Sequence, residues 1–284
     1  MTLGRADHVQ VRTLSPLSRV LGRTVLAASR GELRRPGRCA ACGATALRRH
    51  KSAIRDALVD EWGLSDDERA RFDRREGLAC VRCLSSLRAQ ALAAAIVEWA
   101  RTTHGVEAAS LAGVVASPAL HRLAVAEVNP CGALHPILLG LPGLAFSDYG
   151  DPVRSQDLQA LTYADASFDL MVSSETLEHV PDIDAALGEI GRVLKPGGVH
   201  LFTVPVIWDR ETRARSVVDG DGGRRPLLAD SFHGRTPSPD RLVFREYGGD
   251  VLARLSTARL SCTLAPPASA DELAVFAHRR TGDG

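Results

Sequence analysis

The stretch FDLMVSSETLEHVPDIDAALGEIGRVLKPGGVHLFTV, residues 168–204, decides the fold. It opens with an apolar run at 168–173 and closes with a second one at 199–204, and such short runs predict two buried strands. Between them, apolar residues recur at helical spacing over 182–194, with Asp182 as the N-cap and Lys195-Pro196-Gly197-Gly198 as the stop signal. A strand, a helix and a second strand in this order predict a βαβ unit with parallel strands.

The same alternation continues on both sides of this unit. Further short β-rich runs lie at 123–128, 144–147, 260–264 and 273–277. Strands that alternate with helices indicate an α/β fold. We therefore expect a Rossmann-like, mainly parallel sheet with helices on both faces over residues 109–284.

Composition is that of an ordinary globular protein. The chain has 284 residues, of which 45% are hydrophobic and 24% charged, so it can bury a sizeable core. No stretch approaches the ~18 to 20 uninterrupted apolar residues of a membrane span, so we expect no membrane partner. The first 38 residues hold eight Arg and two acids, as organellar transit segments do, but Arg supplies 33 of the 35 basic residues throughout. We interpret this as compositional bias and expect a cytoplasmic protein.

Charge is distributed unevenly. Residues 1–104 carry 19 basic and 11 acidic side chains, a net +8, and the remainder carries 16 and 23, a net −7. A basic front end attracts nucleic acid or another polyanion, but an ordinary solvated Arg-rich surface has the same composition.

Four of the six cysteines form two pairs of identical spacing, Cys39-x2-Cys42 and Cys80-x2-Cys83. Two such turns complete the closed tetrahedral shell of a structural Zn2+ site, and Gly43 suits the turn after the first pair. The alternatives are four unrelated buried thiols or a redox pair, which the absence of a βαβ context disfavours. Cys131 and Cys262 have no partner at ligand spacing and are interpreted as small buried hydrophobes.

Helical patterns surround the second cysteine pair. Residues 52–62 place apolar side chains at helical spacing, Ser65 begins another acidic helix start, and 84–104 form a long helix that Gly105 ends. We therefore divide the chain into an N-terminal segment (1–38), a zinc-ribbon-like module with a helical insertion (39–86), a linking helix (87–108) and the α/β domain (109–284).

The "LEHV" turn at 177–180 and the "RVLKPGG" stretch at 192–198 resemble class I S-adenosylmethionine-dependent methyltransferases of the methyltransferase type 11 group. The resemblance is strongest over 168–204 and weaker over about 120–280. The paired CxxC module resembles one that some bacterial members carry ahead of the catalytic domain. This resemblance implies S-adenosyl-L-methionine as cofactor.

Positions of the cofactor-binding residues follow from the resemblance and from the rule that ligands of an open parallel sheet bind at the carboxyl ends of its strands. It implies Glu127 and Gly132 beside the methionine part, although only Gly132 remains of the usual glycine cluster. Asp148, with Asp151 as a rival, is expected to accept hydrogen bonds from the ribose hydroxyls. The remaining expected contacts are Asp157 and Leu158 at the adenine and Ser173 and Ser174 beside the methyl group.

Candidates for a proton acceptor are Glu175, His179 and His233. Methyl transfer to an activated carbon depends mostly on positioning, so a base is optional. For Glu178 and His179 the alternative is a structural role in the turn before the helix at Asp182. The long segment 205–244 is expected to cover the acceptor, with Trp208 and His233 near it, and solvated disorder around 219–223 is the alternative.

Three functions remain open from the sequence. The first is O- or N-methylation of a small molecule or glycan, and the second is methylation of RNA held by the basic zinc module. Few aromatic side chains in the first 104 residues, namely Trp62, Phe72 and Trp99, disfavour RNA because they offer little stacking surface. The third is a non-catalytic binding protein whose altered glycine loop no longer accepts the cofactor.

Overall fold

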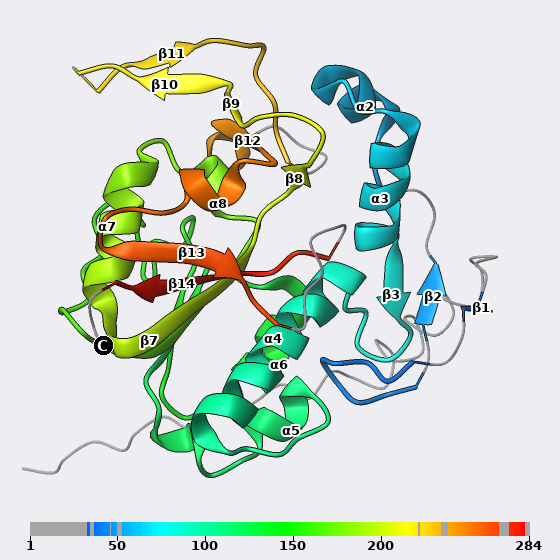
Figure 1. The fold of residues 1–284 in the computed structure, drawn as a ribbon, viewed down its shortest axis with the longest axis vertical. Helices are drawn as coiled ribbons and strands as arrows, with labels where there is room; N and C mark the ends of the chain where they lie inside the picture. The colour runs from blue at the N-terminus through cyan, green and yellow to red at the C-terminus, as the bar shows by residue number, and fades with distance from the viewer. Residues whose placement is uncertain are drawn as a thin grey trace, which may run out of the picture.

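The computed structural model describes residues 33–34, 37–45, 47–49, 53–220, 222–233, 238–266 and 273–281. Its centre is a six-stranded sheet in the order β13-β14-β7-β6-β4-β5 (Figure 1). The pairs β4–β5, β4–β6 and β6–β7 are parallel, whereas β14 runs antiparallel to both β7 and β13. The expected Rossmann-like, mainly parallel sheet is confirmed, and most of segment 1–38 lies outside the described residues.

Strands and helices have the following bounds. The central sheet contains β4 (Val125–Val128), β5 (Leu144–Ser147), β6 (Phe168–Ser174), β7 (Leu194–Thr203), β13 (Leu260–Leu264) and β14 (Phe276–Arg280). The shorter strands are β1 (Leu33–Arg34), β2 (Leu47–Arg49), β3 (Leu78–Cys80), β8 (Val206–Ile207), β9 (Arg213–Ala214), β10 (Ser216–Val218), β11 (Arg224–Pro226) and β12 (Arg245–Gly248). The α-helices are α2 (Asp56–Trp62), α3 (Asp66–Gly77), α4 (Leu87–His104), α5 (Leu111–Val115), α6 (His135–Leu138), α7 (Ile183–Val193) and α8 (Val251–Arg254).

Helices cover both faces of the sheet, because successive side chains of a strand point to opposite faces. On one face, Leu170 and Val172 of β6 pack with residues of α4 and α5. On the other, Met171 packs with residues of α7 and α8. The α4 cluster also contains Cys39 and Cys80, so the apolar core of the cysteine module continues into that of the sheet.

The N-terminal helices form an arm beside the sheet, at the right in Figure 1. Ser65 and Glu68 make a reciprocal capping box at the start of α3. The helix expected at 52–62 begins only at Asp56, and Ala57 on it is exposed. The helix expected at 84–104 begins at Leu87, capped by Ser86, and Gly105 ends it at a φ of 65° as expected.

The stop signal after α7 differs from the expectation. Asp182 caps α7, as predicted, but Lys195–Gly198 belong to β7. Gly198 permits this because a Cβ there would lie 2.7 Å from the Phe168 carbonyl oxygen, and the register shifts between Phe168 and Leu170. The strand expected at 123–128 begins at Val125, and the one expected at 273–277 is displaced to Phe276–Arg280.

Segment 205–244 contains four short strands. β8 and β9 pair with β12, and β10 and β11 form a hairpin that projects at the top of Figure 1. Around 219–223, where disorder was the alternative interpretation, the Asp219 N–H donates a hydrogen bond to the Gly223 carbonyl, and residue 221 lies outside the described residues. Among the described helices, none has the length and apolar character of a bilayer crossing.

Two buried histidines face each other within the sheet layer. His200 and His278 are fully buried, their Nδ1 atoms lie 3.1 Å apart, and Ser173 Oγ lies 2.8 Å from His200 Nε2. Burial lowers the pKa of His278 to about 3 and that of His200 well below its usual value. The folded protein therefore excludes protons that the unfolded chain binds below pH ~6.5.

We expect the free energy of unfolding to fall as the pH drops from neutrality toward 5, and each of these histidines accounts for about 2 kcal/mol at pH 5. His278→Gln removes one titration and gives a shallower dependence in urea unfolding at a series of pH values. His121→Gln, at an exposed position, serves as the control and keeps the wild-type slope. An unchanged slope in His278→Gln contradicts the prediction.

Candidate functional site

A cavity of about 290 Å³ opens at the carboxyl ends of β4 and β6, and we call it the strand-end cavity. Val128 and Asn129 line it after β4, Tyr149 after β5, and Thr176 and His179 after β6. Strand order reverses at this point, because β4 is followed by β5 on one side and by β6 on the other. It is therefore the switch point at which such sheets bind ligands.

The loop after β4 is fixed by hydrogen bonds to buried or neighbouring side chains. Glu127 is fully buried, its Oε1 accepts a hydrogen bond from the Cys131 backbone N–H at 2.8 Å, and its Oε2 lies 2.6 Å from His135 Nδ1. Asn129 has a φ of 58° and accepts from the Tyr149 N–H through its side chain. Glu127 and Gly132, two expected cofactor contacts, lie beside the cavity lining rather than in it.

Other expected cofactor residues are divided in the same way. Asp157 and Leu158 line the strand-end cavity, and the Asp157 carboxylate is oriented by the Gln159 side chain and backbone N–H. Asp148 is half-buried next to the lining residue Tyr149, and Asp151 caps its own loop. Ser173 bonds to His200 inside the sheet. The structure thus brings Asp157, Leu158 and His179 together in one cavity.

A second cavity of about 450 Å³ lies between the N-terminal helices and the sheet edge, and we call it the interface cavity. Its walls are mainly apolar, with Leu58 and Trp62 from α2, Phe72 from α3 and Phe232 from the segment after β7. Glu175 and His233, both predicted proton acceptors, also line it. Trp62 Nε1 donates to Ser231 Oγ at 2.9 Å, which ties the two walls together.

Glu175 sits in an ion-pair network that joins α3 and α4 to the end of β6. Arg75 binds it through two hydrogen bonds of 2.7 and 3.0 Å, and Arg88 contacts Ser174 and pairs with Glu76. Burial alone would raise the pKa of Glu175, but the charges of Arg75 and Arg88 lower it to about 2. A carboxylate held this firmly in its ionised form is a poor proton acceptor at neutral pH.

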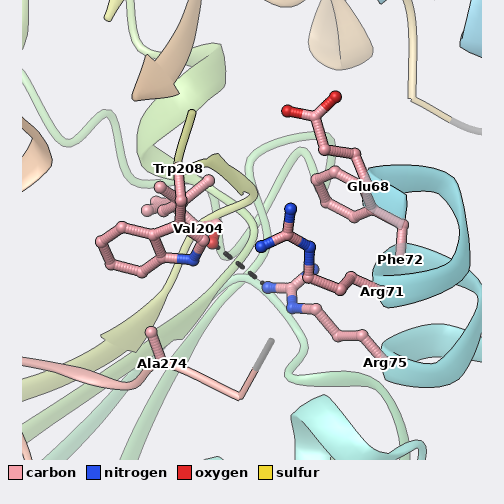
Figure 2. Close-up of a pocket in the computed structure, with 8 residues that line it drawn as sticks. Glu68, Arg71, Phe72, Arg75, Val204, Trp208 and Ala274 are labelled. Atoms are coloured by element: carbon pink, nitrogen blue, oxygen red, sulfur yellow. Dashed lines mark hydrogen bonds between the residues drawn. The ribbon is translucent and has the colours of Figure 1, made fainter. Parts of the chain in front are cut away.

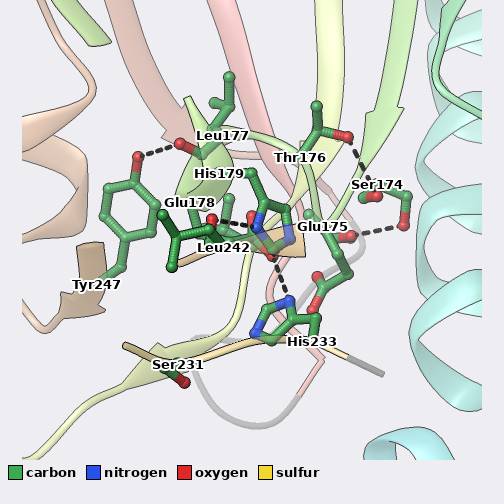
Figure 3. Close-up of polar contacts among 12 residues, drawn as sticks. Ser174, Glu175, Thr176, Leu177, Glu178, His179, Ser231, His233, Leu242 and Tyr247 are labelled. Carbon is green, nitrogen blue, oxygen red and sulfur yellow. Dashed lines mark hydrogen bonds and ion pairs between the residues drawn. The ribbon is translucent and has the colours of Figure 1, made fainter. Parts of the chain in front are cut away.

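Between the two cavities lie Glu178, His179 and His233, the Glu178 cluster (Figure 3). Glu178 Oε1 is 3.3 Å from His233 Nδ1 and 3.7 Å from His179 Nε2, and the two imidazole centroids are 4.7 Å apart. Burial by itself lowers the pKa of His233, but the Glu178 carboxylate raises it on balance. His179 faces the strand-end cavity and His233 the interface cavity.

Backbone contacts fix the turn that carries this cluster. Leu177–His179 form a 3-10 turn directly after β6. The Phe244 N–H donates to the Glu178 carbonyl at 2.8 Å, and Tyr247 Oη donates to the Leu177 carbonyl at 3.3 Å. The structural role that the sequence suggested for Glu178 belongs to its backbone, since its side chain points into the cluster (Figure 3).

Trp208 is not among the lining residues of either cavity. Together with Phe72, Arg75 and Val204 it lines a small cleft beside α3, where Arg75 donates to the Val204 carbonyl at 3.2 Å (Figure 2). Of the two residues expected to bring segment 205–244 to an acceptor, His233 therefore lines the interface cavity and Trp208 does not.

The four predicted zinc ligands converge. Cys39 Sγ lies 3.7 Å from Cys83 Sγ, and Cys42 Sγ lies 3.7 Å from Cys80 Sγ. Four Zn–S bonds of ~2.3 Å in a tetrahedron place the sulfur atoms about 3.8 Å apart, so the observed Sγ–Sγ distances fit a bound zinc ion. They are too long for a disulfide, in which the S–S bond is ~2.05 Å. Gly43 and Leu84 follow the two pairs at φ values of 76° and 62°, so both turns have the same backbone form.

Several lining residues were not predicted from the sequence. Asn129 and Tyr149 come shortly after predicted strands, so they could have been predicted from the rule that ligands bind at the carboxyl ends of parallel strands. No sequence pattern pointed to Arg75 or Arg88, because only the packing of α3 and α4 against the sheet brings them to Glu175.

Comparison with known proteins gives short matches. Residues 142–202 match the model of a family described as a methyltransferase domain, less than half of the chain. "Methyltransferase GfsG" of Streptomyces halstedii is 38% identical over 65 residues, 22% of this chain and 23% of that protein. Dimethylglycine N-methyltransferase of Parasynechococcus marenigrum is 39% identical over 57 residues, 20% of each chain. The matches thus span about a fifth of these relatives.

Among solved structures, the Burkholderia thailandensis 1,6-didemethyltoxoflavin-N1-methyltransferase, with bound 1,6-didemethyltoxoflavin and S-adenosylhomocysteine, is 17% identical. That comparison covers 87% of this chain and 98% of the other, with a TM-score of 0.40. A Mesorhizobium loti S-adenosylmethionine-dependent methyltransferase is 16% identical over 58% of this chain and 94% of its own, with a TM-score of 0.32.

We expect Arg75→Gln to destabilise the protein by about 3 to 5 kcal/mol, because it leaves the Glu175 carboxylate buried without its partner. Urea unfolding at neutral pH measures the loss. Arg101→Gln breaks an exposed pair with Glu98 on α4 and is expected to leave the unfolding midpoint unchanged. Equal midpoints for the two variants would show that the Arg75–Glu175 pair does not stabilise the contact between α3 and the sheet.

Proposed function

We propose that this protein is an S-adenosylmethionine-dependent methyltransferase that acts on a small, mainly apolar acceptor. The observation that carries the proposal is a pair of cavities bordered by neighbouring histidines. His179 lines the cavity at the switch point of the sheet, His233 lines the one under the N-terminal helices, and the two ring centroids are 4.7 Å apart. The match of residues 142–202 to a methyltransferase domain and the two methyltransferase relatives support the same activity.

The strand-end cavity fits the cofactor in its position and donor set. Its volume of about 290 Å³ is at the lower limit of common ligand pockets. In this proposal Asp157 and Leu158 hold the adenine, and Asp148 beside Tyr149 accepts from the ribose hydroxyls. Glu127 and Gly132 shape the loop next to the methionine part, and Ser173 and Ser174 support the end of β6. When bound, the cofactor supplies a methyl group activated by a sulfonium.

The interface cavity is assigned to the acceptor. Leu58, Trp62, Phe72 and Phe232 give it apolar walls, which favour a ring or chain of low polarity over a glycan. The residues of this cavity hold the acceptor and exclude water, and such positioning supplies most of the rate enhancement that methyl transfer needs. His179 borders the strand-end cavity and His233 the interface cavity, whereas Glu175 orients Arg75 and Arg88.

A structural Zn2+ bound by Cys39, Cys42, Cys80 and Cys83 completes the proposal. Ser85 Oγ lies 3.4 Å from Cys39 Sγ and 3.1 Å from Cys83 Sγ, so its hydroxyl can donate to one of these sulfurs. All four positions of a tetrahedral ion are then filled by protein, which is typical of a structural site rather than a catalytic one.

Calorimetric titration with S-adenosylhomocysteine tests the cofactor site. The wild-type protein is expected to bind it, and Asp157→Ala to weaken binding at least tenfold through loss of a carboxylate acceptor. Asp184→Ala, which alters an exposed acid of α7, is the matched control and binds as the wild type does. A folded wild-type protein that binds neither S-adenosylhomocysteine nor S-adenosylmethionine would be a binding protein of another kind.

Native mass spectrometry tests the metal. We expect the wild-type protein to hold one more zinc ion per chain than Cys42→Ser, and Cys42→Ser to lose thermal stability because metal binding and folding of such a site are coupled. Cys262→Ser changes a buried cysteine outside the cluster and retains zinc. Zinc retained at full occupancy in Cys42→Ser would contradict the assignment.

A further inference from the structure

We propose a second metal site, in which Glu178, His179 and His233 bind one divalent transition-metal cation at the junction of the two cavities. The ligand atoms of these side chains lie within 4.8 Å of one another. Binding of the cation is independent of the proposed methyltransferase function. What the cation does for the acceptor rests on that function.

The first argument is the carboxylate itself. Glu178 is fully buried, and within the described part of the chain neither of its oxygens accepts a hydrogen bond. A buried carboxylate is stable only when it is paired or coordinates a metal. Its Oε1 faces two imidazole nitrogens, at 3.3 and 3.7 Å, and these are the partners that a shared cation would have.

The second argument is the orientation of His179. Its Nδ1 lies 2.9 Å from the Leu242 carbonyl oxygen, which can only accept a hydrogen bond, so Nδ1 carries the proton. In the neutral ring Nε2 then carries a lone pair, and this atom faces the Glu178 oxygen. Two electron-rich atoms face each other, and a cation between them removes the repulsion. A hydrogen bond from the other ring nitrogen to a backbone carbonyl is also the usual way in which a metal-binding histidine is oriented.

The third argument is the charge of the surroundings. Arg75 and Arg88 are cations close to the cluster, and each is engaged by Glu76 or Glu175. Two arginines balance two glutamates, and within the described residues the ion-pair partners of Glu178 are His179 and His233. A divalent ion held by these three side chains brings two positive charges to the carboxylate, more than a protonated imidazole does.

The ligand set indicates the kind of metal. Metal–ligand bonds of ~2.1 Å place neighbouring ligand atoms about 3 to 3.5 Å apart, so the 3.3 Å separation fits and the 3.7 Å one needs a small side-chain rotation. Two imidazoles and one carboxylate favour Mn2+, Fe2+, Co2+ or Zn2+ over Mg2+, and leave coordination positions open. Because His233 borders the interface cavity, an open position can bind an oxygen of the acceptor, which makes a hydroxyl-bearing molecule the acceptor class.

Mn2+ is the probe, because hard N/O ligands suit it and the four-cysteine cluster is kept filled with zinc. Titration of protein that holds a single zinc ion per chain, without cofactor, is followed by the electron paramagnetic resonance signal of free Mn2+. One Mn2+ per chain is expected, with nitrogen coupling from imidazole in the pulsed spectrum. Glu178→Gln and His233→Asn each weaken binding at least tenfold, whereas His121→Asn, at an exposed position, leaves it unchanged.

No binding at millimolar Mn2+ by the folded wild-type protein overturns the site. Binding that persists at wild-type affinity in both Glu178→Gln and His233→Asn overturns it as well. Thermal unfolding and zinc content of each variant show that the loss is local. Protein that binds Mn2+ but not S-adenosylhomocysteine refutes the proposed function and retains the metal site, and the reverse result refutes the metal site alone.

Discussion

The bidentate ion pair between Arg75 and Glu175 joins the two parts of this protein. Arg75 belongs to α3 and is 6% exposed, and Glu175 follows β6 and is 18% exposed. At such burial the desolvation of each charge must be offset by ion pairs, and each has the other as its principal partner, with Glu76 also close to Arg75 and Arg88 to Glu175. The pair therefore fixes the N-terminal helices against the carboxyl edge of the sheet, and the interface cavity exists only in that arrangement.

The cysteine module is continuous with the sheet domain rather than appended to it. α4 begins shortly after the second cysteine pair, is capped by Ser86 and packs on the sheet. Cys39 and Cys80 belong to the same apolar cluster as Leu170 of β6. An ion that holds the four thiolates would therefore also fix the start of α4. Through Arg88 on α4, which contacts Ser174 and Glu76, the same constraint extends to the loop after β6.

What the sequence predicted was set by local chemistry. The spacing of apolar residues gave the βαβ unit, Asp182 gave the start of α7, and the paired CxxC spacing anticipated the convergence of four sulfurs. The continuation of β7 through Lys195–Gly198 was missed, because it depends on how closely Gly198 approaches the Phe168 backbone. The partnership of Glu178 with His233 was missed for a similar reason, since these residues are 55 positions apart. Both are hydrogen-bonded to the segment before β12, through the His233 N–H to the Arg241 carbonyl and the Phe244 N–H to the Glu178 carbonyl.

The two cavities are formed by different elements of the fold, so their shapes can change independently. Most of the strand-end cavity comes from loops that directly follow β4, β5 and β6, so its shape follows from the sheet. The interface cavity is assembled from α2, α3, α4 and the segment after β7, which the sheet alone does not place. Changes in the N-terminal helices can therefore alter the second cavity while the first is preserved. Within the Glu178 cluster, His179 borders the first cavity and His233 the second, so a group bound by both histidines would lie between the two.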